Sequence, residues 1–222
     1  GIPADIKDAK AQIWSVNPKK AKPRQVTDVE AGVANLKVAP TGRHFAFTVD
    51  VKMDATVNEL YSDLPKADAR IIDSLLFRHW NAWHDYAYSH LHVARFSNGR
   101  AVDVVDLMDG LRVDCPLQPF GGAENYAWSS DGQEIAYTAK IVNNPAESTD
   151  SNIYLVDIDG GHAKCITPGR PGYETEPVYS PDGKTIAFHS MQRAGFESDR
   201  NRILLYDRSN GSIDELTVGL DQ

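Results

Sequence analysis

The sequence has little of what marks a disulfide-rich, nucleic-acid-binding or membrane-spanning protein. Its 222 residues include two cysteines, Cys115 and Cys165, and two buried thiols or one bridge fit that number equally well. Acidic residues outnumber basic ones by 31 to 23 and no block of Lys and Arg is present, so we expect no nucleic acid partner. No apolar run approaches the roughly 18 residues of a bilayer span, so we expect no membrane span.

Signal, catalytic and metal-binding motifs are also missing. The first residues, GIPADIKDAKAQ, lack the charged-then-apolar pattern of a signal peptide, so an export signal would lie upstream of Gly1. No G-x-S-x-G nucleophile elbow occurs, and we therefore assign no catalytic residue. His79, His84, His90 and His92 lie close in sequence, but no Cys or carboxylate spacing accompanies them, so we expect neither a metal nor a cofactor.

A hairpin pattern occurs three times, in KVAPTGRHFAFTV (37–49), AWSSDGQEIAYTA (127–139) and VYSPDGKTIAFHS (178–190). Two alternating apolar runs around a Gly-containing turn predict an antiparallel hairpin. In the second run of each hairpin, alternation places two apolar side chains on one face, where we expect them to pack between neighbouring repeats. The three pairs are Phe45 with Phe47, Ile135 with Tyr137, and Ile186 with Phe188.

A second β-rich element also recurs, and a turn and another apolar stretch follow each copy. The copies are QIWSVN (12–17), HLHVAR (90–95), NIYLVD (152–157) and RILLYD (202–207). Hairpin and second element together give four strands per unit, here called a to d. Because Asp131-Gly132 and Asp182-Gly183 are 51 residues apart, near the period of a four-stranded blade, the sequence predicts an all-β partial β-propeller.

The predicted boundaries give about three and a half blades. They are a half blade at 12–28 and blades at about 36–115, 125–167 and 176–217. Since a propeller closes with about four to eight blades, we interpret 1–222 as a β-propeller fragment of a longer protein. The alternative is a self-contained three-bladed structure whose edges another subunit covers.

The long connections of the predicted blades share one face of the disc. In an antiparallel blade the b–c connection leaves from the face opposite the a–b and c–d turns. The b–c connections span about 52–89, 141–151 and 191–201, whereas the turns on the other face are short. We therefore expect function to concentrate among these three connections.

The 52–89 connection is too long for a turn. Its apolar residues recur at helical spacing, which predicts a short helical insertion near 63–85, beginning after Pro65. These residues are Ile71, Ile72, Leu75, Leu76 and Trp80.

Arg78, Trp80 and Trp83 are candidate substrate-binding residues of this insertion. The two indoles could form an apolar wall of a substrate channel with Arg78 beside them. Alternatively, both tryptophans clamp the insertion onto the disc.

Three stretches resemble the propeller of prolyl-oligopeptidase-class (family S9) serine peptidases, in the branch of acylaminoacyl peptidases and bacterial dipeptidyl peptidases. They are QVTDVEAGV (25–33), DLPKADARIIDSLLFRHWNAWHDYAYSHLHVA (63–94) and YSPDGKTIAFHSMQRAGFESDRNRILLYD (179–207). The resemblance is to the bacterial dipeptidyl-peptidase 5 type and covers essentially the whole chain. It implies a parent serine exopeptidase whose α/β-hydrolase domain, with the catalytic triad, is absent from this chain.

The resemblance points to Glu197 as the main candidate for substrate binding, with Phe196 beside it. Aminopeptidase-like members of the class hold the substrate ammonium with acidic groups of the propeller, and AGFESDR offers Glu197 and Asp199. The alternative is a surface ion pair of Glu197 with a neighbouring arginine, Arg193, Arg200 or Arg202. Better-studied members present two adjacent glutamates, whereas this loop has Phe196-Glu197-Ser198, so the anchor is looser or differently built.

The sequence thus predicts a propeller that gates and positions oligopeptides for release of dipeptides or acylated residues from their N-termini. The expected partners are oligopeptide substrates and the C-terminal hydrolase domain of the parent chain, with a homodimer of the parent as an option. The expected location is periplasmic or secreted in a bacterium, with the cytoplasm as the alternative. The rival function is a non-enzymatic, TolB-like protein-interaction propeller.

Overall fold

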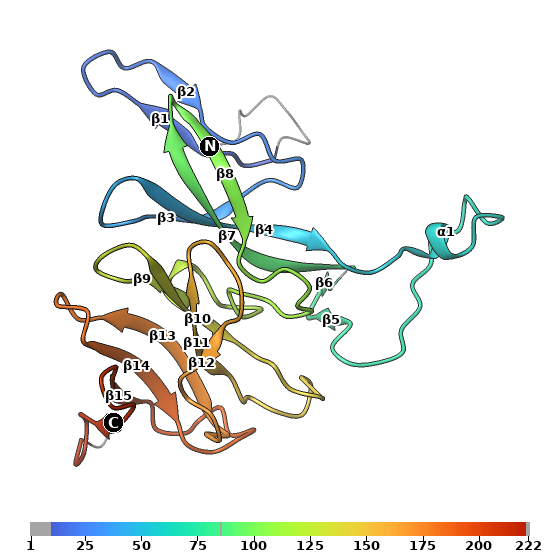
Figure 1. Cartoon of the computed structure of the whole chain (residues 1–222). Helices are drawn as coiled ribbons and strands as arrows, with labels where there is room; N and C mark the ends of the chain where they lie inside the picture. Colours follow the sequence, from blue (N-terminus) through green and yellow to red (C-terminus); the bar gives the residue numbers. More distant parts are fainter. Residues whose placement is uncertain (1–9, 85, 221–222) are drawn as a thin grey trace.

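The computed structural model describes residues 10–84 and 86–220. Residues 1–9, 85 and 221–222 belong to the predicted 1–222 range, and Asp85 to the predicted insertion, but they lie outside the described residues. The described chain forms three four-stranded antiparallel sheets that follow one another side by side (Figure 1). The fold is an all-β partial propeller.

Each sheet is a meander in which consecutive strands pair, apart from the insertion inside the first blade. The half blade contains β1 (Trp14–Val16) and β2 (Pro23–Gln25). The first blade contains β3 (Ala34–Val38), β4 (His44–Lys52), β7 (Ala87–Ser97) and β8 (Arg100–Asp106). The second contains β9 (Tyr126–Trp128), β10 (Glu134–Ala139), β11 (Asn152–Asp157) and β12 (Lys164–Cys165). The third contains β13 (Tyr173–Tyr179), β14 (Thr185–Met191), β15 (Arg202–Asp207) and β16 (Ile213–Glu215).

The a–b turns have a shared geometry because the same short motif builds them. Gly132 and Gly183 have φ angles of 68° and 69°, a left-handed conformation that favours glycine. In the third blade, Asp182 Oδ1 accepts hydrogen bonds from Ser180 Oγ at 2.7 Å and Lys184 N at 3.1 Å. Asp131 makes the same pair of contacts in the second blade, so these turns are set by local sequence.

The core lies in the seams between blades. Ile135 and Tyr137 of β10 are fully buried in a cluster that includes Ala46 of β4. Ile186 and Phe188 of β14 pack in the same way in a cluster with Ala136 of β10. The b strands of the second and third blades therefore turn their large side chains toward the face of the preceding blade that carries Ala46 or Ala136.

Phe45 and Phe47 of β4 complete this series at the first seam. They are buried in a cluster with Val26, and Ile13 of the half blade packs against it. The expected packing of all three apolar pairs is confirmed.

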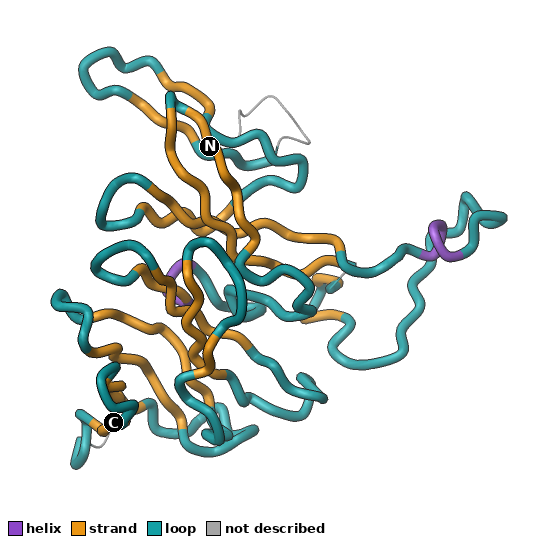
Figure 2. Tube along the Cα trace, in the orientation of Figure 1, coloured by secondary structure: helices purple, strands orange, loops and turns teal. Residues whose placement is uncertain are grey.

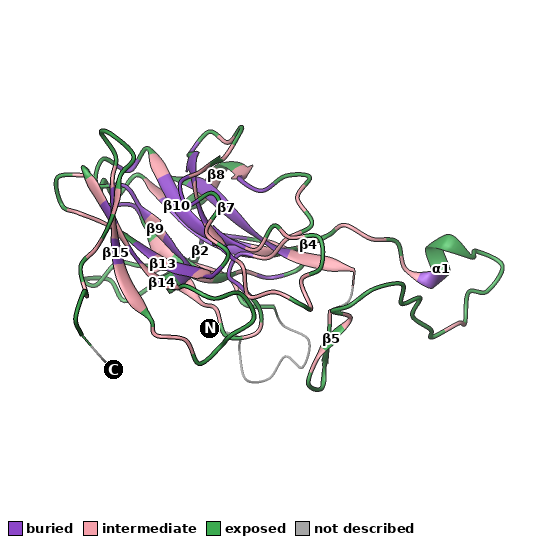
Figure 3. Cartoon of the chain, turned by 90° about the horizontal axis from the view of Figure 1, so that it is seen from below, coloured by how far each residue is buried: buried purple, intermediate pink, exposed green. Residues whose placement is uncertain are grey.

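The helix expected after Pro65 is not formed. The apolar residues that suggested it are about half exposed: Ile71, Ile72, Leu75 and Leu76. A short helix gains most of its stability by burying one apolar face, and this segment lies away from the body of the sheets (Figure 3). The prediction was wrong because the spacing is helical, but the described residues leave these apolar side chains about half exposed.

The 53–86 connection instead contains three very short elements. They are the single-turn helix α1 (Val57–Leu60) and the strands β5 (Arg78–His79) and β6 (Ala82–Trp83), which pair with each other. Within the described ranges α1 is the one α-helix, accompanied by a 3-10 turn at Ala123–Asn125 (Figure 2). Neither is long or apolar enough to cross a membrane.

Candidate substrate-binding face

The two faces of the partial disc differ in the length of their connections. The a–b turns lie together on one side of Figure 1, and the insertion after β4 leaves from the other. Ser130 Oγ of one a–b turn donates to the Ser180 carbonyl of the next at 2.9 Å, so these turns are packed against each other. Room for longer, exposed connections is found on the opposite face.

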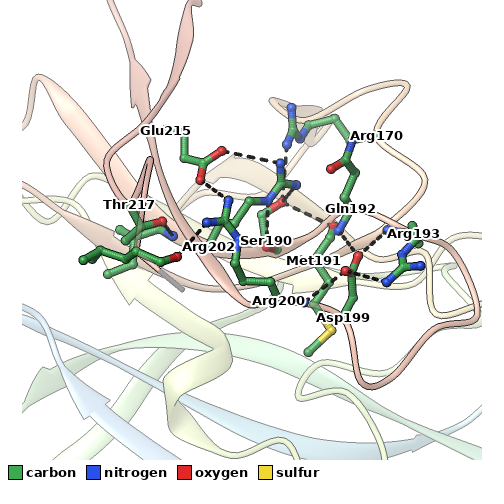
Figure 4. A network of polar contacts seen from close by, with 12 residues as sticks. Arg170, Ser190, Met191, Gln192, Arg193, Asp199, Arg200, Arg202, Glu215 and Thr217 are labelled. Atoms are coloured by element: carbon green, nitrogen blue, oxygen red, sulfur yellow. Dashed lines mark hydrogen bonds and ion pairs between the residues drawn. The ribbon is translucent and has the colours of Figure 1, made fainter. Parts of the chain in front are cut away.

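The connection between β14 and β15 is a closed loop organised by Asp199. Its Oδ2 accepts hydrogen bonds from the backbone amides of Gln192 and Arg193, both at 2.9 Å. Its Oδ1 accepts the amide of Arg200 at 3.0 Å and the guanidinium of Arg193 at 3.2 Å. Figure 4 shows Asp199 at the centre of these contacts. The hydrogen bonds, led by that of the Arg193 amide, lower the pKa of Asp199 to about 2.

Phe196 and Glu197 lie exposed at the tip of this loop. The Arg193 guanidinium is 3.9 Å from the centroid of the Phe196 ring, which fixes the ring by a cation–π contact. The other arginines also have partners, since Arg200 pairs with Glu215 at 2.6 Å and Arg202 donates to Ser190. In the described part of the chain, no hydrogen bond or ion pair engages the Glu197 carboxylate.

A polar network that includes Ser190 and Arg202 lies beside the loop (Figure 4). Glu174 of β13 is fully buried, and its Oε1 accepts hydrogen bonds from Arg170 Nε and Ser190 Oγ, both at 2.9 Å. Arg202 also donates to Ser190 Oγ at 3.2 Å and lies 3.7 Å from Glu215. Burial raises the pKa of Glu174 despite the opposing effect of Arg170. The network joins the ends of β13, β14, β15 and β16 at the base of the loop.

The neighbouring b–c connection of the second blade touches the loop. Gly195 N donates a hydrogen bond of 2.9 Å to Thr149 Oγ1. Lys140, at the end of β10, donates to the Pro145 carbonyl at 2.6 Å. Burial lowers the pKa of Lys140, while the charges of Asp150 and Glu197 oppose that shift. Glu197 therefore lies in a region shared by two blades.

Trp80 and Trp83 are exposed in the insertion rather than packed under it. Trp80 is 67% exposed and Trp83 is 46% exposed, so burial of these two rings contributes little to holding the insertion on the disc. The Trp80 ring meets the edge of Phe120 at a centroid distance of 5.3 Å. Trp83 pairs with Arg78 across the β5–β6 ladder, and the Arg70 guanidinium lies 4.4 Å from its ring centroid.

The predicted site residues thus form two groups. Arg78, Trp80 and Trp83 belong to the insertion, and Phe196 and Glu197 belong to the third blade. Across the described ranges, no hydrogen bond, ion pair or ring contact links the two groups directly. Both extend from b–c connections, so they share a face without forming one compact site.

Sequence reasoning missed Phe120 and Thr149. Phe120 is 77% exposed and comes from the link between the first and second blades, far in sequence from Trp80. Its position between Pro119 and two glycines was a local signal for an exposed loop aromatic. Thr149 had no such signal, because its contact depends on how two blades are placed.

His90 has a structural role, and neither cysteine forms a disulfide. His90 is fully buried, with Nδ1 2.8 Å from Asp106 and Nε2 2.8 Å from the Leu111 carbonyl. Outside the undescribed positions, no group of three His, Cys, Asp or Glu residues is arranged to hold a metal ion. Cys115 and Cys165 are both free thiols.

Comparison with known proteins points to one class of protein with this fold. No protein-family model matches the chain. The acylaminoacyl peptidase of Pyrococcus horikoshii has a similar fold, with a TM-score of 0.61, 13% identity, and coverage of 95% of this chain and 29% of that chain. A prolyl endopeptidase structure gives a TM-score of 0.52 at 12% identity, covering 92% of this chain and 25% of that one. The fold is therefore a partial propeller shared with peptidases of family S9.

Relatives found by sequence similarity identify the family more narrowly than the fold does. Dipeptidyl-peptidase 5 of Porphyromonas gingivalis is 36% identical over 182 residues, which make up 81% of this chain and 26% of that protein. Dipeptidyl-peptidase 5 of Porphyromonas endodontalis is 32% identical over 200 residues, 89% of this chain and 29% of that protein. The chain therefore belongs to the dipeptidyl-peptidase 5 family, which confirms the resemblance found in the sequence. The chain spans between a quarter and a third of the length of these relatives.

Proposed function

We propose that this chain is the part of a serine exopeptidase propeller that admits oligopeptides and positions their N-termini for release of dipeptides or acylated residues. A hydrolase domain of the parent protein would supply the catalytic triad. The observation that carries this proposal is Glu197, an exposed carboxylate with no ion-pair partner among the described residues, at the tip of a loop whose other charged groups are paired.

The chemistry of an ammonium group fits Glu197. A peptide with a free N-terminus carries a positive charge, and a carboxylate binds it by a charge-assisted hydrogen bond. Asp199 and Glu215 already have arginine partners, and Asp199 has filled its acceptor positions. Glu197 can accept the new charge without breaking an existing contact.

The insertion supplies candidate walls for the peptide. Trp80 and Trp83 offer exposed aromatic faces, and Arg78 lies beside Trp83. Phe196 offers a third ring next to Glu197, already immobilised by Arg193. We propose that these side chains contact the peptide on either side of its first residues.

An uncovered sheet face supports a parent propeller longer than 1–222. In each of the first two blades, the face that points toward the following blade is buried. Its residues are Ala46, Leu91 and Val93 in the first blade and Ala136, Ile153 and Leu155 in the second. The equivalent residues of the third blade, Ala187, Ile203 and Leu205, are only half-buried, and Val178 beside them is 60% exposed. A further blade of the parent protein would cover this face as β9–β12 cover the first blade.

The deciding experiment compares two substrates in the parent enzyme. Glu197→Gln should lower kcat/KM for free-amine dipeptide substrates by roughly 30- to 1000-fold, since it removes the charge that pairs with the ammonium. A substrate with a blocked N-terminus has no ammonium, so its hydrolysis should change little. Asp159→Asn, at an exposed aspartate in the c–d turn of the second blade, is the matched control and should alter neither rate.

Equal losses on both substrates would reject Glu197 as the ammonium anchor. The purified 222-residue chain should hydrolyse neither substrate, and turnover that copurifies with it would reject the assignment of the chemistry to another domain. A periplasmic or secreted location and a homodimer of the parent stay predictions.

A further inference from the structure

We propose that Asp199 is a positioning residue for the peptide N-terminus: it closes the 192–200 loop and thereby presents Glu197 and Phe196 at its tip. This inference rests on the proposed function of Glu197. It also assigns the two acidic residues of AGFESDR different roles.

Asp199 has no capacity left for an ammonium group. An ionised carboxylate offers about four lone-pair positions. Four donors occupy those of Asp199: the amides of Gln192, Arg193 and Arg200, and the Arg193 guanidinium. A substrate ammonium would have to displace one of them, so Asp199 acts on the substrate only through the loop.

The contacts of Asp199 determine the path of the chain between its partners. Its carboxylate brings residues 192 and 193 next to residue 200, which closes the base of the loop. The Asp199 amide donates to the Phe196 carbonyl at 3.0 Å, and the Phe196 amide points to the Arg193 carbonyl at 3.4 Å. These turns leave Phe196, Glu197 and Ser198 exposed at the tip.

Arg193 links the base of the loop to its tip. Its guanidinium donates to Asp199 Oδ1 and lies 3.9 Å from the Phe196 ring centroid. One carboxylate thus holds both the backbone of the loop and, through Arg193, the aromatic ring next to Glu197. Loss of Asp199 would free both at once.

Thr149 provides a second, independent tether. Its Oγ1 accepts the Gly195 amide at 2.9 Å from the b–c connection of the second blade. Asp199 fixes the shape of the loop, and Thr149 fixes its place relative to the second blade. A loop ordered before the ligand arrives loses less conformational entropy on binding, so both tethers favour tight binding of the ammonium.

The test uses the parent enzyme and compares Asp199→Asn with Asp182→Asn. Asp182 accepts a backbone amide and a serine hydroxyl in the a–b turn of the same blade, on the opposite face, and serves as a structural match. For a free-amine dipeptide substrate, Asp199→Asn should raise KM by about tenfold and leave kcat within about twofold, because binding and not chemistry is impaired. Asp182→Asn should change neither, although both variants lower the thermal midpoint.

A double-mutant cycle with Glu197→Gln separates positioning from general damage. If Asp199 acts through Glu197, Asp199→Asn should raise KM by less than about twofold when Glu197 is already Gln. Thr149→Val, which removes the second tether and keeps the side-chain shape, should raise KM by about threefold in the wild-type background and not in the Glu197→Gln background.

The outcomes distinguish this inference from the proposed function. Suppose that Glu197→Gln lowers kcat/KM for free-amine substrates. If Asp199→Asn then leaves KM unchanged, or raises it equally in the Glu197→Gln background, the positioning role of Asp199 is wrong. Glu197 would still be the ammonium anchor in that case. If Glu197→Gln has no selective effect, the anchor itself is wrong. Amide hydrogen exchange on the 222-residue chain gives a direct check, since the amides of Gln192, Arg193 and Arg200 should lose protection in Asp199→Asn.

Discussion

Tyr179 and Glu134 join the third blade to the second: the Tyr179 hydroxyl donates a hydrogen bond of 2.6 Å to Glu134 Oε1, which also accepts Arg208 at 2.7 Å. Because this bond ends on a charged, mostly buried carboxylate, Tyr179→Phe should lower the free energy of unfolding by about 1–2 kcal/mol. Urea unfolding of the 222-residue chain, with and without the substitution, measures this difference in the free energy of unfolding. Tyr61→Phe, at a half-exposed tyrosine of the insertion, is the control and should have no measurable effect.

The seam between the same two blades should be sensitive to cavities. Phe188 is buried in a cluster with Ala136, so Phe188→Ala should lower the free energy of unfolding by about 3–5 kcal/mol. Val178→Ala, on the uncovered face of the third blade, should change it by less than about 0.5 kcal/mol. Similar losses in both variants would mean that the third blade buries its two faces equally, contrary to the packing described here.

Stability should decrease as pH rises above neutrality because of His90. Burial, the largest influence, lowers the pKa of His90, but the hydrogen bond and charge of Asp106, with the Leu111 carbonyl, outweigh it, and the net pKa is raised above 6.5. A raised pKa in the folded state gives a stabilisation that is complete below about 6.5 and is lost as pH rises through the folded value. We therefore expect the free energy of unfolding to fall from pH 6.5 upward.

Unfolding curves for wild type and His90→Asn from about pH 6 to pH 9 test this slope. The variant should be less stable throughout but should show a shallower decline. His84 contributes in the same direction, because its hydrogen bond with Asp114 raises its pKa. Parallel curves for wild type, His90→Asn and His84→Asn would contradict the assignment of this pH dependence to the two histidines.

Trp80 should matter for substrates more than for stability. Its side chain is 67% exposed, so Trp80→Ala should change the free energy of unfolding by less than about 0.5 kcal/mol. If its ring contacts the peptide, KM of the parent enzyme for oligopeptides should rise by about three- to tenfold. Trp14→Ala, at a partly exposed tryptophan of the half blade, is the comparison, and an equal rise in KM there would argue against a specific role for Trp80.

The blades could be predicted from the sequence because their signals are local. Alternation in β10 and β14 places Ile135 with Tyr137 and Ile186 with Phe188 without knowledge of the rest of the chain. The aspartate and glycine of each a–b turn define its geometry within a few residues. The pairing of consecutive strands could be predicted because short turns join them.

The insertion could not be predicted in the same way. Helical spacing at Ile71 and Leu75 predicts a helix only if another surface covers the apolar side, and no local pattern reports that surface. The roles within the 192–200 loop were also hidden, since Glu197 and Asp199 are both acidic and two residues apart. Their difference arises from which backbone amides point inward, a property of the folded loop.

The ladder between β4 and β7 runs without a break from the His44–Arg95 pair to the Lys52–Ala87 pair, although the whole 53–86 detour lies between the two strands. At the other end, the a–b turns touch each other through Ser130 and Ser180, so lengthening one would displace its neighbour. Added residues should therefore be tolerated at the rim that carries the detour and resisted at the rim formed by the a–b turns. A reporter or affinity tag grafted into the chain would be accommodated at the outer end of the detour, near α1, without disturbing the strand register.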